Sequence, residues 1–178
     1  MLKVRIPSDV IKKGRLFAEQ VYNYRHGNAD KFLNGAELEA DLNGFEVEFA
    51  NCFAFGLPFP KIFNGSKVDK FDCFLAVPNE NGLLQLLKFD VKTSEEFLIN
   101  KKQFERKEID AYLFESLDFQ DFQTDMIFLK FHGWIKKAEI KQNSEVKSFE
   151  NGSTAYKINP AALQDPGKLF ALNQARGI

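Results

Sequence analysis

The chain has 178 residues, 44% of them hydrophobic, and its 24 basic and 25 acidic side chains give a formal net charge of −1. This length and hydrophobic content predict one compact domain over residues 1–178. A net charge close to zero argues against binding of nucleic acid through an overall basic surface, so only local basic clusters could serve that purpose. No run of eighteen apolar residues and no secretory signal is present, and a cytoplasmic protein is therefore expected.

The metal-binding and redox residue types are few. Cys52 and Cys73 suit buried reduced thiols, because a disulfide framework or a zinc site needs further ligands. His26 and His132 are isolated in the sequence and do not make a metal cluster. The twenty phenylalanines indicate an aromatic core more simply than a surface for stacking bases.

The N-terminal part predicts a short strand and then a helix. Apolar residues alternate over residues 2–6, and a helix is expected over Asp9–Tyr24 with Ser8 as its N-cap. Its apolar stripe consists of Val10, Phe17 and Val21. A polar passage over residues 25–35 follows.

A second helix is predicted from Asn43, ending where Gly56 and Pro58 stop helical periodicity. Its buried stripe consists of Phe45, Phe49 and Cys52. Glu48 borders this stripe, whereas Glu46 falls toward the other flank. A carboxylate in that position needs a partner, unless it only extends to solvent at the edge of the stripe.

Two strands, Asp72–Val77 and Leu83–Lys92, are predicted to form an antiparallel hairpin around the turn-rich residues 78–82. If Val77 opposes Leu83, Asp72 opposes Lys88, and Asp90 becomes a diagonal neighbour of Asp72 on the same face, about 7–8 Å away. Lys92 lies on that face too, whereas Val91 points into apolar packing. A register shifted by one residue would instead bring Asp69 opposite Asp90.

The hairpin would thus gather two carboxylates and one ammonium. Carboxylate oxygens bind Mg²⁺ or Mn²⁺ and leave positions open for water and a phosphate oxygen. The nearby ammonium would orient or deprotonate the attacking water and offset charge in the transition state. Two carboxylates and an ammonium are the groups that a metal-dependent phosphodiesterase uses. Charged residues also alternate on solvated strand faces, and that alternative stays open.

After the hairpin, Thr93, Ser94 and Asn100 are candidates for helix caps or turns. The basic residues that follow are candidate phosphate contacts: Lys101, Lys102, Arg106 and Lys107. Gln103 would help to orient phosphate from the same helix. The alternative is an ordinary solvated helix face. Core strands are expected in 109–114 and 126–140, with an acidic loop over 115–125, a polar connection over 143–153, an edge strand at 155–159 and a short helix or tail at 168–174.

Together these motifs resemble the PD-(D/E)XK nuclease superfamily, whose members share an α/β core with a helix-borne Glu, a strand-borne Asp and a D/E-X-K strand. The resemblance rests on GFEVEFANCFAFGLP as the first core helix, on Asp-Val-Lys, and on the Gly-Trp-Ile strand within residues 131–137. It spans about 44–140. It departs from the pattern where Phe71 replaces the proline before Asp72.

The resemblance implies a restriction endonuclease-like core, a central mixed sheet flanked by helices. It assigns Glu48, Asp72, Asp90 and the backbone carbonyl of Val91 to the metal, and Lys92 to the water. It also allows a homodimer, by analogy with relatives that cut both strands.

The expected function is a Mg²⁺- or Mn²⁺-dependent deoxyribonuclease, with endonuclease favoured by the lack of an obvious end-binding module. One competing interpretation is an inactive nuclease-fold module that binds nucleic acid or a protein. Another is an unrelated α+β interaction protein in which the Asp-Val-Lys strand is accidental.

Overall fold

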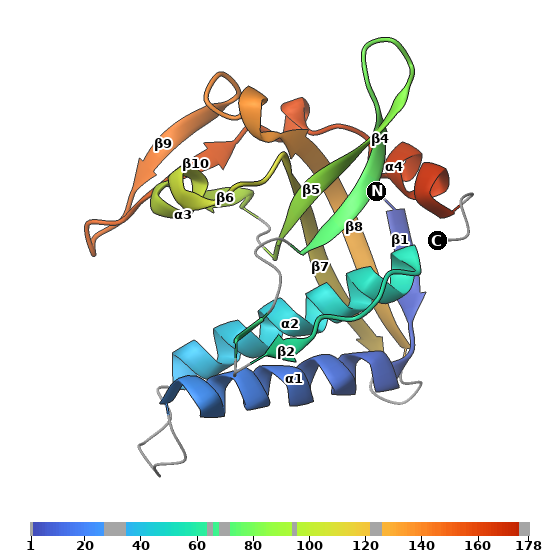
Figure 1. The fold of residues 1–178 in the computed structure, drawn as a ribbon. Coiled ribbons are helices and arrows are strands. Elements are labelled where there is room, and N and C mark those ends of the chain that lie inside the picture. The colour runs from blue at the N-terminus through green and yellow to red at the C-terminus, as the bar shows by residue number, and fades with distance from the viewer. Residues whose placement is uncertain are drawn as a thin grey trace. The chain divides into compact units, whose positions relative to one another are not determined.

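The computed structural model describes residues 2–26, 35–63, 66–67, 72–93, 96–121 and 126–174, and it has a mixed α/β architecture (Figure 1). The helices are α1 (Ser8–His26), α2 (Gly35–Phe55), α3 (Lys101–Arg106) and α4 (Pro166–Gln174), with short 3-10 turns η1 (Lys137–Glu139) and η2 (Pro160–Ala162). The strands are β1 (Leu2–Ile6), β2 (Ile62–Phe63), β3 (Ser66–Lys67), β4 (Cys73–Pro78), β5 (Leu84–Lys92), β6 (Leu98–Asn100), β7 (Ala111–Asp121), β8 (Met126–Lys136), β9 (Ser144–Ser148) and β10 (Thr154–Ile158). Among the described helices, none contains an apolar stretch sufficient to span a lipid bilayer.

The strands form three sheets. The largest has the order β1-β8-β7-β5-β4, a second has the order β6-β10-β9, and β2 pairs with β3. Strand β4 is antiparallel to β5, whereas β7 is parallel to β5. The parallel pair requires a crossover, and the segment containing β6 and α3 provides it.

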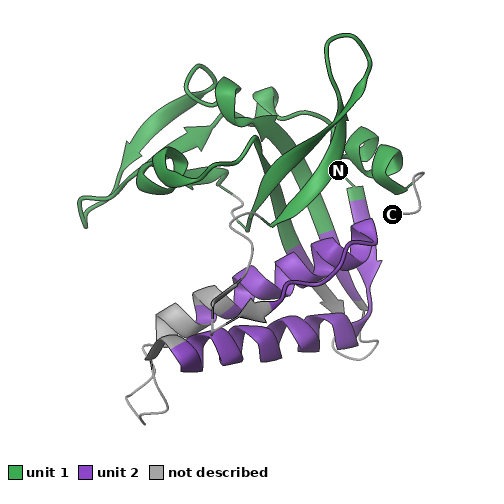
Figure 2. Cartoon of the chain, viewed as in Figure 1, with its two compact units in different colours: residues 1–2, 71–116, 130–178 green, residues 3–70, 117–129 purple. Residues whose placement is uncertain are grey.

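The chain contacts group into two compact units, coloured separately in Figure 2. Unit 1 contains residues 1–2, 71–116 and 130–178, and unit 2 contains residues 3–70 and 117–129. Strands β7 and β8 contribute residues to both units. The interpretation of the chain as one domain stays a prediction.

In unit 2, α1 packs against α2, and the predicted stripe of α1 is confirmed because Val10, Phe17 and Val21 are all buried. Gly14 permits the close approach of the helices, since a Cβ atom there would lie 2.8 Å from the carbonyl oxygen of Phe45. Helix α2 begins at Gly35 and not at Asn43 as predicted. Packing against α1 therefore overrides the weak helix propensity of the Asn43-Gly44 pair.

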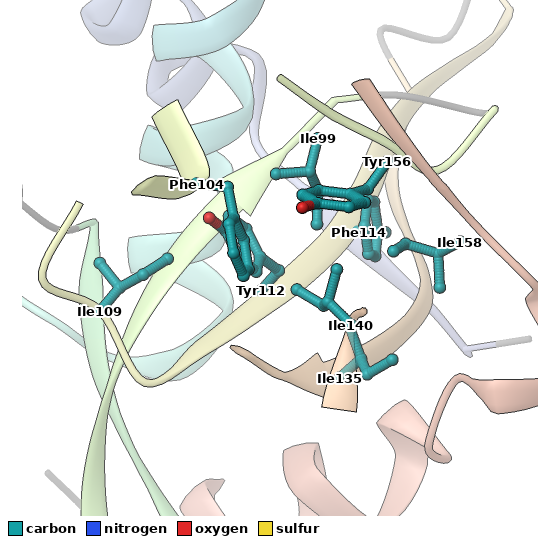
Figure 3. Packing of buried hydrophobic residues seen from close by; sticks show 9 residues of the cluster. All are labelled: Ile99, Phe104, Ile109, Tyr112, Phe114, Ile135, Ile140, Tyr156 and Ile158. Carbon is teal, nitrogen blue, oxygen red and sulfur yellow. The ribbon is translucent and has the colours of Figure 1, made fainter. Parts of the chain in front are cut away.

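The core of unit 1 joins side chains from both of its sheets and from α3 (Figure 3). Its buried members are Ile99, Phe104, Ile109, Tyr112, Phe114, Ile135, Ile140, Tyr156 and Ile158. This packing fixes α3 against β7, because Phe104 is the buried residue of that short helix. The helix that follows the Asp-Val-Lys strand is thus held in one place.

Three predictions about strands are wrong. The acidic segment predicted as a loop over 115–125 is part of β7 as far as Asp121, and Glu115 in it is buried. The polar connection over 143–153 contains β9, and β10 is the central strand of its sheet and not an edge. Pairing with neighbouring strands overrode the low strand propensity of the acidic and polar residues.

The Gly-Trp-Ile motif of β8 has a local explanation. A Cβ atom at Gly133, whose φ is +152°, would lie 2.7 Å from the Cβ atom of Leu163. The close approach allows the backbone of Trp134 to exchange hydrogen bonds with Gln164, and the indole ring lies edge-on to Phe89 of β5 at 5.7 Å. The motif therefore anchors the segment that precedes α4.

Candidate active site

The hairpin that carries the predicted acids is confirmed, but its predicted register is wrong. The pairs are Val77 with Gln85 and Phe74 with Lys88, a shift of two residues from the predicted register. Asn79 causes the shift, because its side chain accepts hydrogen bonds from the N–H groups of Asn81 and Leu83 and closes the loop one residue later. A two-residue shift preserves the face on which each side chain lies.

The observed register brings Asp72 opposite Asp90 instead of diagonal to it, since Cys73 pairs with Phe89. Asp72 leaves the regular ladder, and its carboxylate Oδ2 accepts the N–H of Val91 at 2.6 Å. The carboxylate of Asp72 is therefore held beside Val91, the middle residue of Asp-Val-Lys. The one-residue shift that would have brought Asp69 opposite Asp90 is wrong, and Asp69 itself lies outside the described residues.

Asp90 is a buried carboxylate held by two lysines. Its side chain is only 1% exposed, with Lys92 Nζ 2.6 Å from Oδ2 and Lys107 Nζ in contact with Oδ1. Burial alone would raise the pKa of Asp90, but the two ammonium groups outweigh it and hold the pKa below its ordinary value. Asp90 therefore stays ionised near neutral pH, and the alternative of a solvated strand face is wrong for this residue.

Helix α3 supports the site from the other side. Asn100 is confirmed as its N-cap, because its side chain accepts the N–H groups of Lys102 and Gln103. The cap orients Gln103, whose Oε1 accepts a hydrogen bond from Lys92 Nζ at 3.2 Å. Gln103 thus contacts the predicted catalytic lysine directly, a contact that the sequence did not predict.

Lys107 is the site residue that sequence reasoning missed. It was included only among the basic residues that follow the strand, yet its ammonium contacts Asp90. No local signal was available, because α3 ends at Arg106 and Lys107 follows it in an extended conformation, so helical spacing from Gln103 does not place its side chain.

Tyr112 adds a buried hydroxyl beside Asp90. It is the parallel-strand partner of Asp90, and its ring centre lies 5.9 Å from Lys92 Nζ. Burial first, and then the charge of Asp90, raise the pKa of Tyr112, so its phenol stays protonated. The hydroxyl makes no hydrogen bond to any described residue, and in Figure 3 it points away from Ile135 and Ile140. It is available to donate to a bound group.

Glu48 belongs to unit 2, whereas Asp72, Asp90 and Lys92 belong to unit 1. Its side chain is buried on α2, and its part in the site stays a prediction. The neighbouring Glu46 is also buried and has a structural partner, because Arg15 of α1 contacts its Oε1 at 2.7 Å.

The predicted phosphate contacts differ in their surroundings. Lys102 and Arg106 are exposed, whereas the ammonium of Lys101 lies 5.6 Å from the ring centre of Tyr156. Their contact with nucleic acid stays a prediction.

The donor types of this site fit a divalent cation. Asp72 and Asp90 supply hard oxygen atoms on adjacent strands, and the Tyr112 hydroxyl is a buried polar atom that still lacks a partner. In the part of the chain that the structure describes, no three His, Cys, Asp or Glu side chains form a metal-binding group. A cation on Asp90 would have to displace an ammonium, and Lys107 is the more exposed of the two.

No protein-family model, curated protein or solved structure gives a significant match to this chain.

Proposed function

We propose that this protein is a metal-dependent phosphodiesterase that cleaves DNA, as an endonuclease of the PD-(D/E)XK type. One observation carries the proposal: Asp72 accepts a hydrogen bond from Val91 of the Asp-Val-Lys strand, in which Lys92 is paired with the buried Asp90. Two carboxylates and an ammonium on adjacent strands are the groups that metal-assisted phosphodiester hydrolysis requires.

The order of elements supports a restriction endonuclease-like core. Helix α2 is followed by the β4–β5 hairpin, the α3 crossover and the parallel strand β7. The sheet is mixed, because β5 is antiparallel to one neighbour and parallel to the other. An α/β core with the acids on a hairpin is what the resemblance to this superfamily implies.

Asp72, Asp90 and the carbonyl of Val91, with Glu48, would hold Mg²⁺ or Mn²⁺. When bound, the cation supplies Lewis acidity and lowers the pKa of a bound water. The Gln103 hydrogen bond to Lys92 orients the ammonium toward the attacking water. The protonated Tyr112 hydroxyl donates a hydrogen bond to a phosphate oxygen or to that water.

The test is cleavage of supercoiled plasmid and of labelled branched and single-stranded DNA, with Mg²⁺, Mn²⁺ or EDTA. Lys92→Ala should abolish metal-dependent cleavage, and Lys92→Arg should not restore it, because a planar guanidinium cannot take the place of the compact ammonium between Asp90 and Gln103. Lys88→Ala is the matched control on the same strand and should retain activity. Folded wild-type protein that cleaves none of these substrates with either metal would refute the proposal.

A second candidate function is a non-catalytic nuclease-fold module that binds nucleic acid or a protein. The observation in its favour is that both oxygens of Asp90 are already paired with lysines. It predicts DNA binding without cleavage and no heat of Mn²⁺ binding in calorimetry. Heat that disappears in Asp90→Asn would exclude it in favour of the nuclease.

The remaining features of the proposal concern partners and location. DNA would run along α3, where Lys101, Lys102, Gln103 and Arg106 would contact its phosphates. We propose a cytoplasmic location, because the buried Cys52 and Cys73 suit reduced thiols better than a disulfide framework. A homodimer would supply the two sites that a double-strand cut needs.

A further inference from the structure

Unit 1 contains a hollow of about 600 Å³ that lies outside the predicted site, at the end of β8. Lys136, Lys137 and Lys141 line it, together with Leu87, Phe104 and one acid, Asp110. Its volume is within the range of ligand-binding sites, and its lining is cationic with an apolar floor.

Two of the three lysines meet over one aromatic ring. The ammonium groups of Lys137 and Lys141 lie 5.1 Å and 5.9 Å from the centre of the same Phe104 ring. Among the described residues, none of the three lysines has a carboxylate within ion-pair distance. Like charges gathered over an apolar surface repel one another, so an anion placed among them would be stabilised.

The nearby acids offset only part of this charge. Asp110 brings one negative charge to the lining against three lysines, and its Oδ2 accepts the backbone N–H of Lys88 at 2.8 Å. Glu139 lies between Lys137 and Lys141 in sequence, but its Oε2 is 3.5 Å from the amide nitrogen of Gln164. The hollow therefore keeps an excess of positive charge.

One residue connects the hollow to the predicted site. The ammonium of Lys107 contacts Asp90, and the backbone carbonyl of Lys107 accepts a hydrogen bond from Lys137. Helix α3 contributes to both places, since Gln103 contacts Lys92 and the next residue, Phe104, forms the floor of the hollow. The predicted site and Lys137 of the hollow are therefore separated by a single residue, Lys107.

We propose that the hollow binds phosphate groups of the DNA strand next to the phosphate that is cleaved. This inference rests on the proposed function for the identity of its ligand. The regular spacing of charge along a DNA strand brings further phosphates near any bound phosphate, and lysines are suitable point charges for them.

The test measures DNA binding apart from cleavage. A short fluorescein-labelled duplex is titrated in EDTA and followed by fluorescence anisotropy over a series of NaCl concentrations. The test variant is Lys136→Ala/Lys141→Ala. Lys137 is left intact because it holds the backbone of Lys107. The matched control is Lys147→Ala/Lys157→Ala, which removes the same charge from β9 and β10.

The test variant should bind at least about tenfold more weakly at about 0.1 M salt, and the slope of log affinity against log salt should fall by about 2. The control should lose much less. An unchanged slope, a loss equal to that of the control, or wild-type protein that does not bind DNA would overturn the inference. Circular dichroism checks that each variant is folded.

Plasmid cleavage with Mn²⁺ separates this inference from the proposed function. If the wild type binds DNA through these lysines but never cleaves it, the nuclease proposal fails and the phosphate site stands. If the wild type cleaves DNA and the test variant binds it normally, the nuclease proposal stands and the phosphate site is overturned.

Discussion

The strongest prediction concerns competition between Lys107 and a divalent cation for Asp90. Lys107→Met removes one ammonium from a carboxylate that is 1% exposed, while keeping most of the side chain's apolar volume. A hydrogen bond to a charged group contributes about 1.5–3 kcal/mol. We take the lower value, about 1.5 kcal/mol, because the Lys107 side chain is 32% exposed and Lys92 remains on the other oxygen.

The free energy of the Lys107–Asp90 contact should appear both in the stability of the protein and in its affinity for the cation, with opposite sign. Without metal, the variant should lose about 1.5 kcal/mol of its free energy of unfolding. A cation that no longer has to displace Lys107 should bind about tenfold more tightly, because 1.4 kcal/mol corresponds to a factor of ten. Urea unfolding in EDTA measures the first effect, and isothermal titration calorimetry with Mn²⁺ measures the second.

Lys101→Met is the control, since it makes the same chemical change on a lysine that lies over the Tyr156 ring. It should alter the free energy of unfolding by less than about 1 kcal/mol and leave Mn²⁺ affinity unchanged. Loss of stability in Lys107→Met without tighter Mn²⁺ binding would refute the competition and leave Lys107 with a purely structural role.

Three further predictions follow from the same contacts. Asp72→Asn removes the charge but keeps an acceptor for the N–H of Val91, so it should abolish cleavage. In urea unfolding it should lose less stability than Asp72→Ala, which should lose about 1–2 kcal/mol, and equal losses in the two variants would contradict this. Asn173→Ala removes both hydrogen bonds to the backbone of Ala76 and should lower the free energy of unfolding by about 2–4 kcal/mol, whereas Lys168→Ala, at an exposed position of the same helix, should change it by less than about 0.5 kcal/mol. Folding lowers the pKa of Asp90, so the ionised Asp90 stabilises the protein fully above its unfolded-state pKa of about 3.9, and this stabilisation is lost as the pH falls through the folded-state pKa. The free energy of unfolding, measured at a series of pH values, should therefore fall less steeply toward low pH in Asp90→Asn than in the wild type.

Local sequence signals predicted the elements of the site well. Alternating apolar residues and the turn-rich residues 78–82 predicted the hairpin, and Asn100 was one of three candidates for a cap or turn after it. The register was not predictable from the same signals. It depends on which N–H groups the Asn79 side chain accepts, and a turn-rich segment is compatible with several such choices.

Contacts made by tertiary packing were beyond sequence reasoning. Lys107 reaches Asp90 only because Phe104 fixes α3 against β7, and no local pattern gives the orientation of a six-residue helix. Strand β9 was missed for a related reason. Its sequence, SEVKS, has little strand propensity of its own, and pairing with β10 decides its conformation.

The contact between Asn173 and Ala76 has a consequence for the behaviour of the protein at high concentration. Strand β4 is at one end of the five-stranded sheet, where a row of open backbone groups could recruit a strand from another molecule. Helix α4 lies beside β4 (Figure 1). The Asn173 amide donates to the carbonyl of Ala76 and accepts its N–H, so it occupies that position as an added strand would. Helix α4 therefore blocks this position of β4 from pairing with a strand of another molecule, and Asn173→Ala should favour fibrillar aggregation.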